Sequence, residues 1–235
     1  MGNKAAGGPR RWVPAAVAAA ALALGLPAAV LAAGLNWGAF AFASVAGLLL
    51  TLVLAYEKSG PNARETALVA SLGAVAAAGR IPFAVLPGVQ PVTFICILSG
   101  MVFGARTGFA VGALAAALSN FALGQGPWTP WQMLAWGLAG ATAGWMRGPL
   151  ARTGRPGLAA FGVIWGYLFG LIVNMWVWTS SFYPVDLRSL LAVEATSLAF
   201  DTAHAAGNAV FALLLGREAR RVLERFRARI TVEKT

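Results

Sequence analysis

Residues 93–146 read TFICILSGMVFGARTGFAVGALAAALSNFALGQGPWTPWQMLAWGLAGATAGWM, and Arg106 is their only charged residue. A helix needs about 20 mainly apolar residues to cross the hydrocarbon of a bilayer. The stretch therefore predicts consecutive membrane spans, the first of them short. Only Ala105 and Arg106 separate the first two spans, which form either a tight hairpin or one bent region. The predicted spans here are Val92–Gly104, Thr107–Leu123 and Thr129–Met146.

The sequence on both sides of this stretch is also apolar. The 235 residues are 59% hydrophobic and 11% charged, with a mean hydropathy of +0.71, so most of the chain is expected to be surrounded by lipid. The sequence predicts an all-α, polytopic transmembrane bundle of about eight spans. The further spans are Val13–Ala33, Leu35–Ala55, Thr66 to about Val85, Leu158–Ser180 and Ala192–Gly216.

Basic residues are unevenly divided between alternate loops. The net charge is +10, which in a soluble protein would suggest a nucleic-acid partner. Here 16 of the 18 Lys and Arg residues lie in the N-terminus, the 56–65 and 147–157 loops, Arg106 and the tail from Arg217, leaving only Arg80 and Arg188 on the other side. Because Lys and Arg collect in cytoplasmic loops, a multi-pass protein of the cell (inner or plasma) membrane with both termini in the cytoplasm is predicted.

The two ends of the chain have additional interpretations. The basic N-terminus and the alanine-rich run at 13–33 also resemble a cleaved signal peptide, whose removal would leave the later orientation unchanged. The tail 217–235 carries Val222, Phe226 and Ile230 at helical spacing among arginines. This pattern predicts a cytoplasmic or membrane-surface helix.

Small residues recur at helical spacing on several spans. Lipid gives little hydrophobic drive between helices, so close approach at small residues supplies the packing. Two glycine series predict packing within the chain: Gly100, Gly104, Gly108 and Gly112, and Gly137, Gly140 and Gly144. The series Ala70, Ala74 and Ala78 either packs in the same way or receives a partner subunit.

Polar groups are costly inside a membrane, so their positions indicate function. In the predicted orientation they gather toward the outer ends of the spans. Trp128 and Trp131, in an uncharged Gly- and Pro-rich segment, are either interfacial anchors or the wall of a pocket for a planar, weakly charged ligand. The candidate ligand-binding residues are Arg80, Gln90, Asn120, Gln125, Trp128, Thr129, Gln132, Trp136, Asn174, Trp178, Asp201 and His204.

The last predicted span carries a polar stripe. Glu194, Ser197, Asp201, His204 and Asn208 are spaced by 3, 4, 3 and 4 residues and share one helical face. The Asp201 carboxyl group must be protonated, paired or hydrated, and Arg80 and His204 are its available partners. His204 is a packing residue, a proton relay or a ligand contact.

Several chemistries lack their sequence motifs. The chain has no Gly-x-x-x-x-Gly-Lys-Ser/Thr phosphate loop, no His-Glu-x-x-His pattern and no Cys/His metal cluster. It is therefore not expected to hydrolyse ATP, to hold a metal or a resident cofactor, or to be an enzyme.

From about Thr66 to Gly216 the chain resembles the substrate-binding S components of energy-coupling factor (ECF) vitamin transporters. The resemblance rests on the alanine series, an irregular loop with Pro82, Pro87 and Pro91, and the stretch quoted above with its glycine-rich turn, Asn120, Gln-Gly-Pro-Trp-Thr and Gln132. It implies a six-helix substrate-binding core at 66–216. A basic segment and an added transmembrane hairpin at 1–65 would precede this core, and a basic tail at 217–235 would follow it.

The resemblance also implies a function and partners. Such proteins bind a vitamin or its precursor from outside, and the Gln-Gly-Pro-Trp-Thr-Pro segment looks most like the cobalamin type. A transmembrane scaffold and two ATPase subunits would dock at Ala70, Ala74 and Ala78 and drive the S component to topple and release its cargo. The residues leave two alternatives: a proton-coupled carrier that uses Asp201 and His204 as a relay, and a membrane-embedded enzyme or assembly factor.

Overall fold

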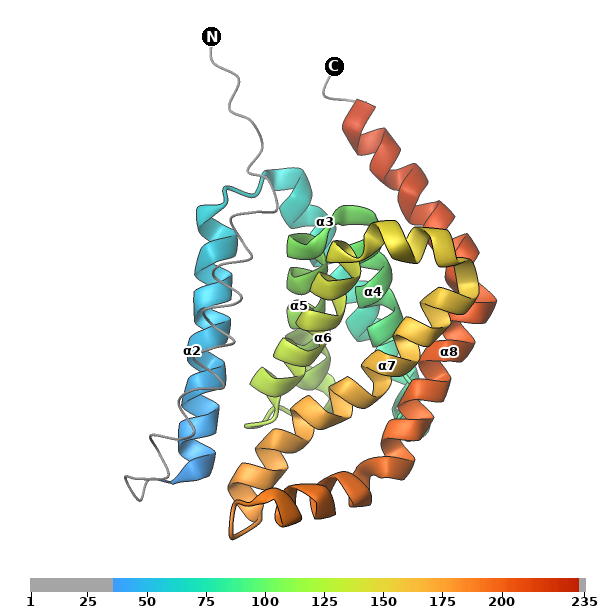
Figure 1. The fold of residues 1–235 in the computed structure, drawn as a ribbon. Helices are drawn as coiled ribbons and strands as arrows, with labels where there is room; N and C mark the ends of the chain where they lie inside the picture. The colour runs from blue at the N-terminus through green and yellow to red at the C-terminus, as the bar shows by residue number, and fades with distance from the viewer. Residues whose placement is uncertain (1–35, 233–235) are drawn as a thin grey trace.

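A computed structural model describes residues 36–232, and all regular elements within that range are helices (Figure 1). The predicted first span, Val13–Ala33, lies outside the described residues. The remaining seven predicted spans correspond to seven helices, which confirms the all-α bundle. They are α2 (Trp37–Lys58), α3 (Ala63–Arg80), α4 (Val92–Phe103), α5 (Ala105–Leu123), α6 (Thr129–Trp145), α7 (Arg147–Ser181) and α8 (Leu187–Val232), with a short 3-10 helix η2 (Pro82–Val85) after α3.

Five segments of the described chain are long and apolar enough to cross a membrane: Trp37–Lys58, Ala63–Val85, Ala105–Leu123, Arg147–Ser181 and Leu187–Arg229. The 12 residues of α4 extend only about 18 Å, well short of a hydrocarbon layer of about 30 Å. All but two of its residues are buried. A short apolar helix of this kind is stable because neighbouring helices surround it.

α4 and α5 form a tight hairpin rather than one bent helix. Gly104 connects them with a φ of +102°, a conformation that residues with a side chain rarely adopt. Gly100 and Gly108 are each four residues from Gly104, and a Cβ added at Gly108 would lie 2.6 Å from the Cα of Gly100. The two glycines therefore face each other across the hairpin. Gly104 therefore makes the turn, and no atom would contact a Cβ added to it within 4 Å.

Except for Gly137, which faces the Phe109 ring, the other glycines of the two series hold α4, α5 and α6 in backbone contact. A Cβ at Gly100 would lie 1.8 Å from the carbonyl oxygen of Gly140, and one at Gly112 would lie 2.3 Å from the backbone of Trp136. A Cβ at Gly144 would lie 2.3 Å from the backbone nitrogen of Ala105. The predicted packing within the chain is confirmed, and it holds α5 against α6, whose far ends carry the polar residues.

Two boundaries differ from the prediction. The expected loop at 147–157 is helical and belongs to α7, with a break at Gly154, where φ is +64° and ψ is −152°. Glycine tolerates this conformation, so the chain bends there without a loop. The tail from 217 is helical, as predicted, but it continues α8 without interruption as far as Val232.

α2 lies on one side of the bundle and α8 on the other, with α4, α5 and α6 between them (Figure 1). The buried face of α2, formed by Val45, Leu49 and Leu52, packs in a cluster that includes Phe109 of α5 and Trp131 of α6. α2 also contacts α7. The division of the chain at residues 65 and 216 stays a prediction.

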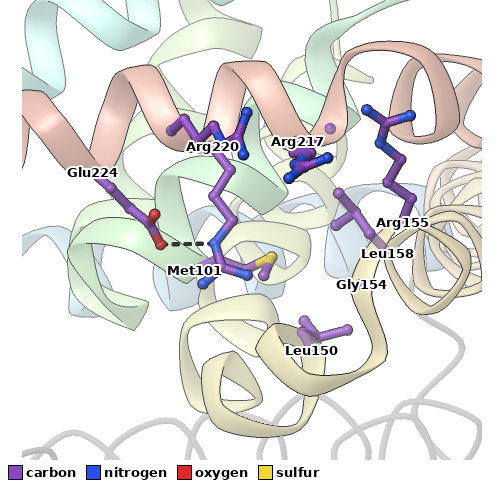
Figure 2. Close-up of a pocket in the computed structure, with 10 residues that line it drawn as sticks. Met101, Leu150, Gly154, Arg155, Leu158, Arg217, Arg220 and Glu224 are labelled. Atoms are coloured by element: carbon purple, nitrogen blue, oxygen red, sulfur yellow. Dashed lines mark hydrogen bonds and ion pairs between the residues drawn. The ribbon is translucent and has the colours of Figure 1, made fainter.

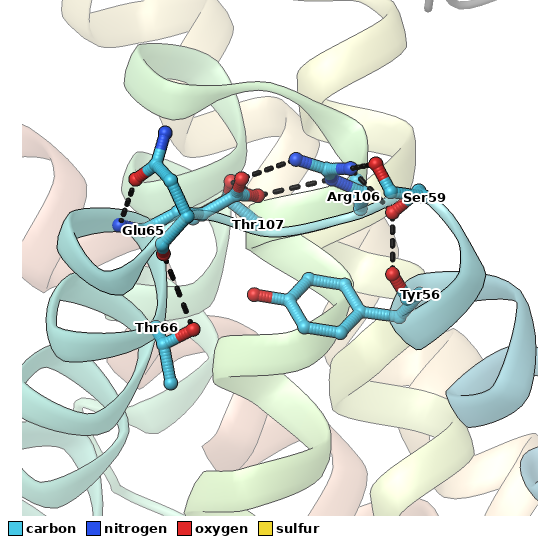
Figure 3. Close-up of polar contacts among 7 residues, drawn as sticks. Tyr56, Ser59, Glu65, Thr66, Arg106 and Thr107 are labelled. Carbon is cyan, nitrogen blue, oxygen red and sulfur yellow. Dashed lines mark hydrogen bonds and ion pairs between the residues drawn. The ribbon is translucent and has the colours of Figure 1, made fainter.

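Polar contacts join the segment after α2 to the core (Figure 3). Arg106, at the start of α5, forms an ion pair with Glu65 of α3 and donates a hydrogen bond to the Ser59 hydroxyl. Its guanidinium also lies 5.4 Å from the centre of the Tyr56 ring. A single arginine in the glycine-rich turn therefore ties α2, α3 and α5 together at one end of the bundle.

Candidate functional site

Arg80 is the centre of a buried polar network at the end of the bundle where α3 terminates. Its side chain is only 8% exposed. Its Nε donates to Oε1 of Gln90 at 3.0 Å, and a terminal nitrogen donates to the Ser119 hydroxyl at 2.7 Å and to Oδ1 of Asn120 at 2.6 Å. All three acceptors are neutral, so Arg80 brings a net positive charge to this end.

Asn120 extends the network from α5 to α6. It is 1% exposed, and its Nδ2 donates to the Thr129 hydroxyl at 2.9 Å and to Oε1 of Gln132 at 2.8 Å. Thr129 in turn donates to Oε1 of Gln125 at 3.0 Å. We call this set the Arg80 network; it consists of Arg80, Gln90, Ser119, Asn120, Gln125, Thr129 and Gln132.

Local structure explains why α5 and α6 present these residues together. Asn120 lies in the last turn of α5, and Gly124, with a φ of +107°, ends that helix. Thr129 then begins α6, with Pro130 in its first turn, a position where proline costs no hydrogen bond. The short connection returns the chain so that the start of α6 lies beside the end of α5.

An aromatic layer lies against the Arg80 network; we use this name for Thr93, Trp136, Phe169 and His204. The Trp136 ring centre is 4.9 Å from the Arg80 guanidinium, and Phe169 stacks on Trp136 with ring centres 4.7 Å apart. The Trp136 indole donates to the Thr93 hydroxyl at 2.9 Å, and this hydroxyl is 2.8 Å from Nε2 of His204. Four helices thus meet at one small group of flat and polar side chains.

Asp201 belongs to a different cluster, between α7 and α8. Its carboxylate accepts a hydrogen bond from Ser197 at 2.7 Å, and Ser197 accepts one from Asn174 at 2.7 Å. A Cβ at Gly170 would lie 2.1 Å from the Asp201 carboxylate, so this glycine provides the space for it.

The sequence left Asp201 protonated, paired or hydrated, and of these alternatives the pairing with Arg80 or His204 is wrong. Within the described residues, Asp201 has no ion pair. The Arg80 donors are directed at the neutral acceptors of its own network, and His204 bonds to Thr93. The spacing of the polar stripe is correct: Asp201 meets Ser197 of the same stripe, four residues earlier on α8, whereas His204 meets Thr93 of α4.

The two remaining candidate residues, Trp128 and Trp178, have other neighbours. Trp128 packs edge-on against Trp176 of α7, with ring centres 5.6 Å apart. The Trp178 indole donates to Ser189 at 2.9 Å, at the connection between α7 and α8. Both tryptophans thus contact the segment around the end of α7 rather than the Arg80 network.

Four participants were missed by the sequence prediction as site residues. Ser119 adjoins Asn120, Thr93 lies in the first turn of the short helix α4, Phe169 lies in an apolar run, and Ser197 belongs to the predicted polar stripe. The stripe itself was a sufficient indication for Ser197. Nothing in the sequence distinguishes Thr93 or Phe169 from residues that only pack.

The arrangement suits recognition better than chemistry. Arg80, the amides and the hydroxyls provide both donors and acceptors, and Trp136 and Phe169 provide apolar flat surfaces beside them. Such a combination is typical of small-molecule sites, in which a few polar groups orient a mainly apolar ligand. Among the described residues there is no group of three His, Cys, Asp or Glu side chains that would hold a metal ion.

Comparison with known proteins gives one family. The model of the ECF-type riboflavin transporter S component matches residues 63–221, about two-thirds of the chain. No curated protein and no solved structure matches it. The match begins at the first residue of α3 and includes the whole Arg80 network and the aromatic layer.

The family match has a functional meaning. It supports a multi-pass membrane protein that is the substrate-specific component of a transporter rather than an enzyme. It does not support the predicted cobalamin type. The chain belongs to the family of ECF-type riboflavin transporter S components.

Proposed function

We propose that this chain binds riboflavin, or a closely related flavin, at the Arg80 end of the bundle for ATP-driven uptake. The observation that carries the proposal is the contact between the Arg80 network and the aromatic layer, within the residues that the riboflavin-type model matches. Riboflavin has a flat three-ring system whose pyrimidine edge alternates carbonyl oxygens with an N–H group. The amides of Asn120 and Gln132 complement such an edge, and Trp136 and Phe169 complement the flat face.

Ligand binding requires the network to exchange partners. Nε and one terminal nitrogen of Arg80, and Nδ2 of Asn120, already donate to neighbouring side chains, so a ligand that uses these donors must replace some of those bonds. Gln90 and Gln125 are suited to leave, because they lie in the connections before α4 and α6 rather than within helices. We infer that these two connections move when the ligand enters, while the helices stay in place.

The face of α3 supports docking to a scaffold subunit. Ala70, Ala74 and Ala78 are all exposed in the described part of the chain. α2 packs on α6 and α7, so it leaves this face of α3 open. A smooth surface of small side chains permits close helix approach in lipid. We propose that this face receives the transmembrane scaffold, that two ATPases supply the energy, and that the termini are cytoplasmic.

Binding to the purified protein tests the ligand. Isothermal titration calorimetry in detergent is expected to show saturable binding of riboflavin and none of cobalamin. Asn120→Ala removes three hydrogen bonds of the network and should weaken binding at least about tenfold. Asn208→Ala is the matched control, because Asn208 is equally buried but bonds to the Gly162 carbonyl between α7 and α8.

The outcomes separate the possibilities. Saturable binding of cobalamin without riboflavin would reject the flavin and keep the S-component function. An Asn120→Ala protein that binds riboflavin as well as the native chain would reject the site. No hydrogen bond links Asp201 to His204 in the described chain, so a proton relay between them has no support there. Uptake that persists without ATPase subunits and stops when the proton gradient collapses would nevertheless favour a proton-coupled carrier.

A further inference from the structure

A pocket lies at the end of the bundle opposite the Arg80 network, between α4, α7 and α8 (Figure 2). Its volume is about 290 Å³. Sites for drug-sized molecules occupy about 300–1,000 Å³, so this pocket suits a smaller group, such as the headgroup of a lipid.

The floor of the pocket is apolar. Met101 near the end of α4 and Leu150 and Leu158 of α7 line it, and all three are buried. In Figure 2 Met101 and Leu158 lie beneath the arginine side chains. A fully hydrated ion would leave this apolar surface uncovered.

The rim of the pocket is cationic, with Arg155 from α7 and three arginines from α8. Two of the latter are paired: Arg220 with Glu224 at 2.7 Å and Arg221 with Glu218 at 3.2 Å. Arg155 and Arg217 have no acidic partner among the described residues. The rim therefore presents two guanidinium groups that are not neutralised within the described chain.

The kink in α7 forms one side of this pocket. Gly154, at the break in the helix, lines the pocket, and Arg155 follows it directly. On the other side, Gly216 ends the apolar part of α8 and Arg217 begins its charged part. Arg155 and Arg217 thus lie at the boundary between the apolar and the charged parts of their helices. In a membrane protein this boundary lies at the level of the lipid headgroups.

We propose that this pocket binds the phosphate of an anionic phospholipid, with the adjoining glycerol and upper acyl chain over the apolar floor. A guanidinium group binds phosphate oxygens through two parallel hydrogen bonds, and Arg155 and Arg217 provide two such groups. The apolar floor favours an amphiphile over free phosphate. In the proposed orientation this end faces the cytoplasmic leaflet, where anionic lipids and basic segments attract each other.

Thermal unfolding and native mass spectrometry of the full chain in detergent test the proposal. Added phosphatidylglycerol should raise the melting temperature and remain bound, whereas phosphatidylcholine and inorganic phosphate should do neither. The double variant Arg155→Gln/Arg217→Gln should bind phosphatidylglycerol about thirtyfold more weakly. The matched control is Arg147→Gln/Arg152→Gln, which removes the same charge at the same end of α7 but outside the pocket.

Equal loss in both double variants would overturn the proposal, because net charge alone would then explain lipid binding. Equal stabilisation by inorganic phosphate would also overturn it, because the occupant would then be a free anion. Arg155→Lys/Arg217→Lys keeps the charge and loses the planar fork, and it should bind with intermediate affinity. All four positions are exposed, so circular dichroism should show an unchanged helix content. The result does not depend on which vitamin occupies the Arg80 end.

Discussion

Arg80 shows how a buried cation is accommodated without a counter-ion. Its guanidinium donates to Gln90, Ser119 and Asn120 and lies over the Trp136 ring. Hydrogen bonds from a charged donor are shorter and stronger than neutral ones, and an aromatic face adds further stabilisation when water is excluded. The residue is therefore suited both to hold α3 against α5 and to accept a polar ligand in place of a neutral partner.

At this scale we predict that Arg80→Lys lowers stability although it preserves the charge. A lysine ammonium is a point charge without the planar fork, so it cannot reach all three acceptors and stack on Trp136. The expected loss is about 1–3 kcal/mol, seen as a lower thermal midpoint of the purified protein. Arg188→Lys is the control, since Arg188 is exposed, and it should leave the midpoint unchanged. Equal midpoints for the two variants would contradict the network.

At the scale of elements, backbone contact between helices dominates the core. Gly100, Gly108 and Gly140 lie so close together that a Cβ on any of them would overlap backbone atoms. Because a backbone atom cannot rotate away as a side chain can, substitutions here must separate whole helices. This seam positions Asn120 beside Thr129 and Gln132.

Gly100→Ala is predicted to destabilise the bundle by about 3 kcal/mol or more, because its Cβ would lie 1.8 Å from the Gly140 carbonyl oxygen. Gly47→Ala on α2 provides the comparison: nothing lies within 4 Å of its Cβ, and alanine favours the helix. Thermal unfolding in detergent measures both. A Gly100→Ala protein as stable as Gly47→Ala would show that the helices are farther apart than described.

A second prediction concerns the contact that joins α3 to α5. Arg106 and Glu65 form an ion pair with side chains 30% and 16% exposed. A double-mutant cycle with Arg106→Gln and Glu65→Gln should give a coupling energy of about 1 kcal/mol in the unfolding equilibrium. Limited proteolysis of the 59–62 connection should accelerate in Arg106→Gln, because Ser59 loses its donor. Additive effects of the two substitutions would exclude a direct interaction.

At the scale of the whole molecule, the two ends of the bundle differ in how their arginines are placed. One end has the buried Arg80 network, and the other has the exposed arginines of α7 and α8. Between them, Ala70, Ala74 and Ala78 form an exposed face of small side chains on α3. Ligand capture, subunit docking and lipid contact are thus proposed at three separate places.

Separate places predict separable effects. Ala74→Leu on α3 should impair co-purification with the scaffold and ATPase subunits by about tenfold or more, while riboflavin affinity stays within about twofold. The larger side chain prevents close helix approach but contacts no residue of the Arg80 network. Ala199→Leu on the exposed face of α8 is the matched control and should assemble normally. Normal assembly of Ala74→Leu would move the docking surface elsewhere.

Much of this organisation is predictable from local sequence. Apolar runs indicated the spans of the described chain and their approximate ends, and the Gly-x-x-x-Gly spacing predicted the packed seam. The polar stripe on α8 and the amides of the 120–132 region identified the end that holds the polar network. These features can be predicted from the sequence because, in a membrane, each helix must form its own backbone hydrogen bonds and polar side chains are costly unless they are buried against protein.

Tertiary structure alone decided which polar residues of different helices meet. Asp201 bonds to Ser197 four residues earlier on α8, a contact that the helical spacing itself permits, whereas His204, three residues further on, bonds to Thr93 of α4. Helical periodicity specifies the face on which a side chain lies, but its partner depends on the rotation, depth and crossing of other helices, which no single segment encodes.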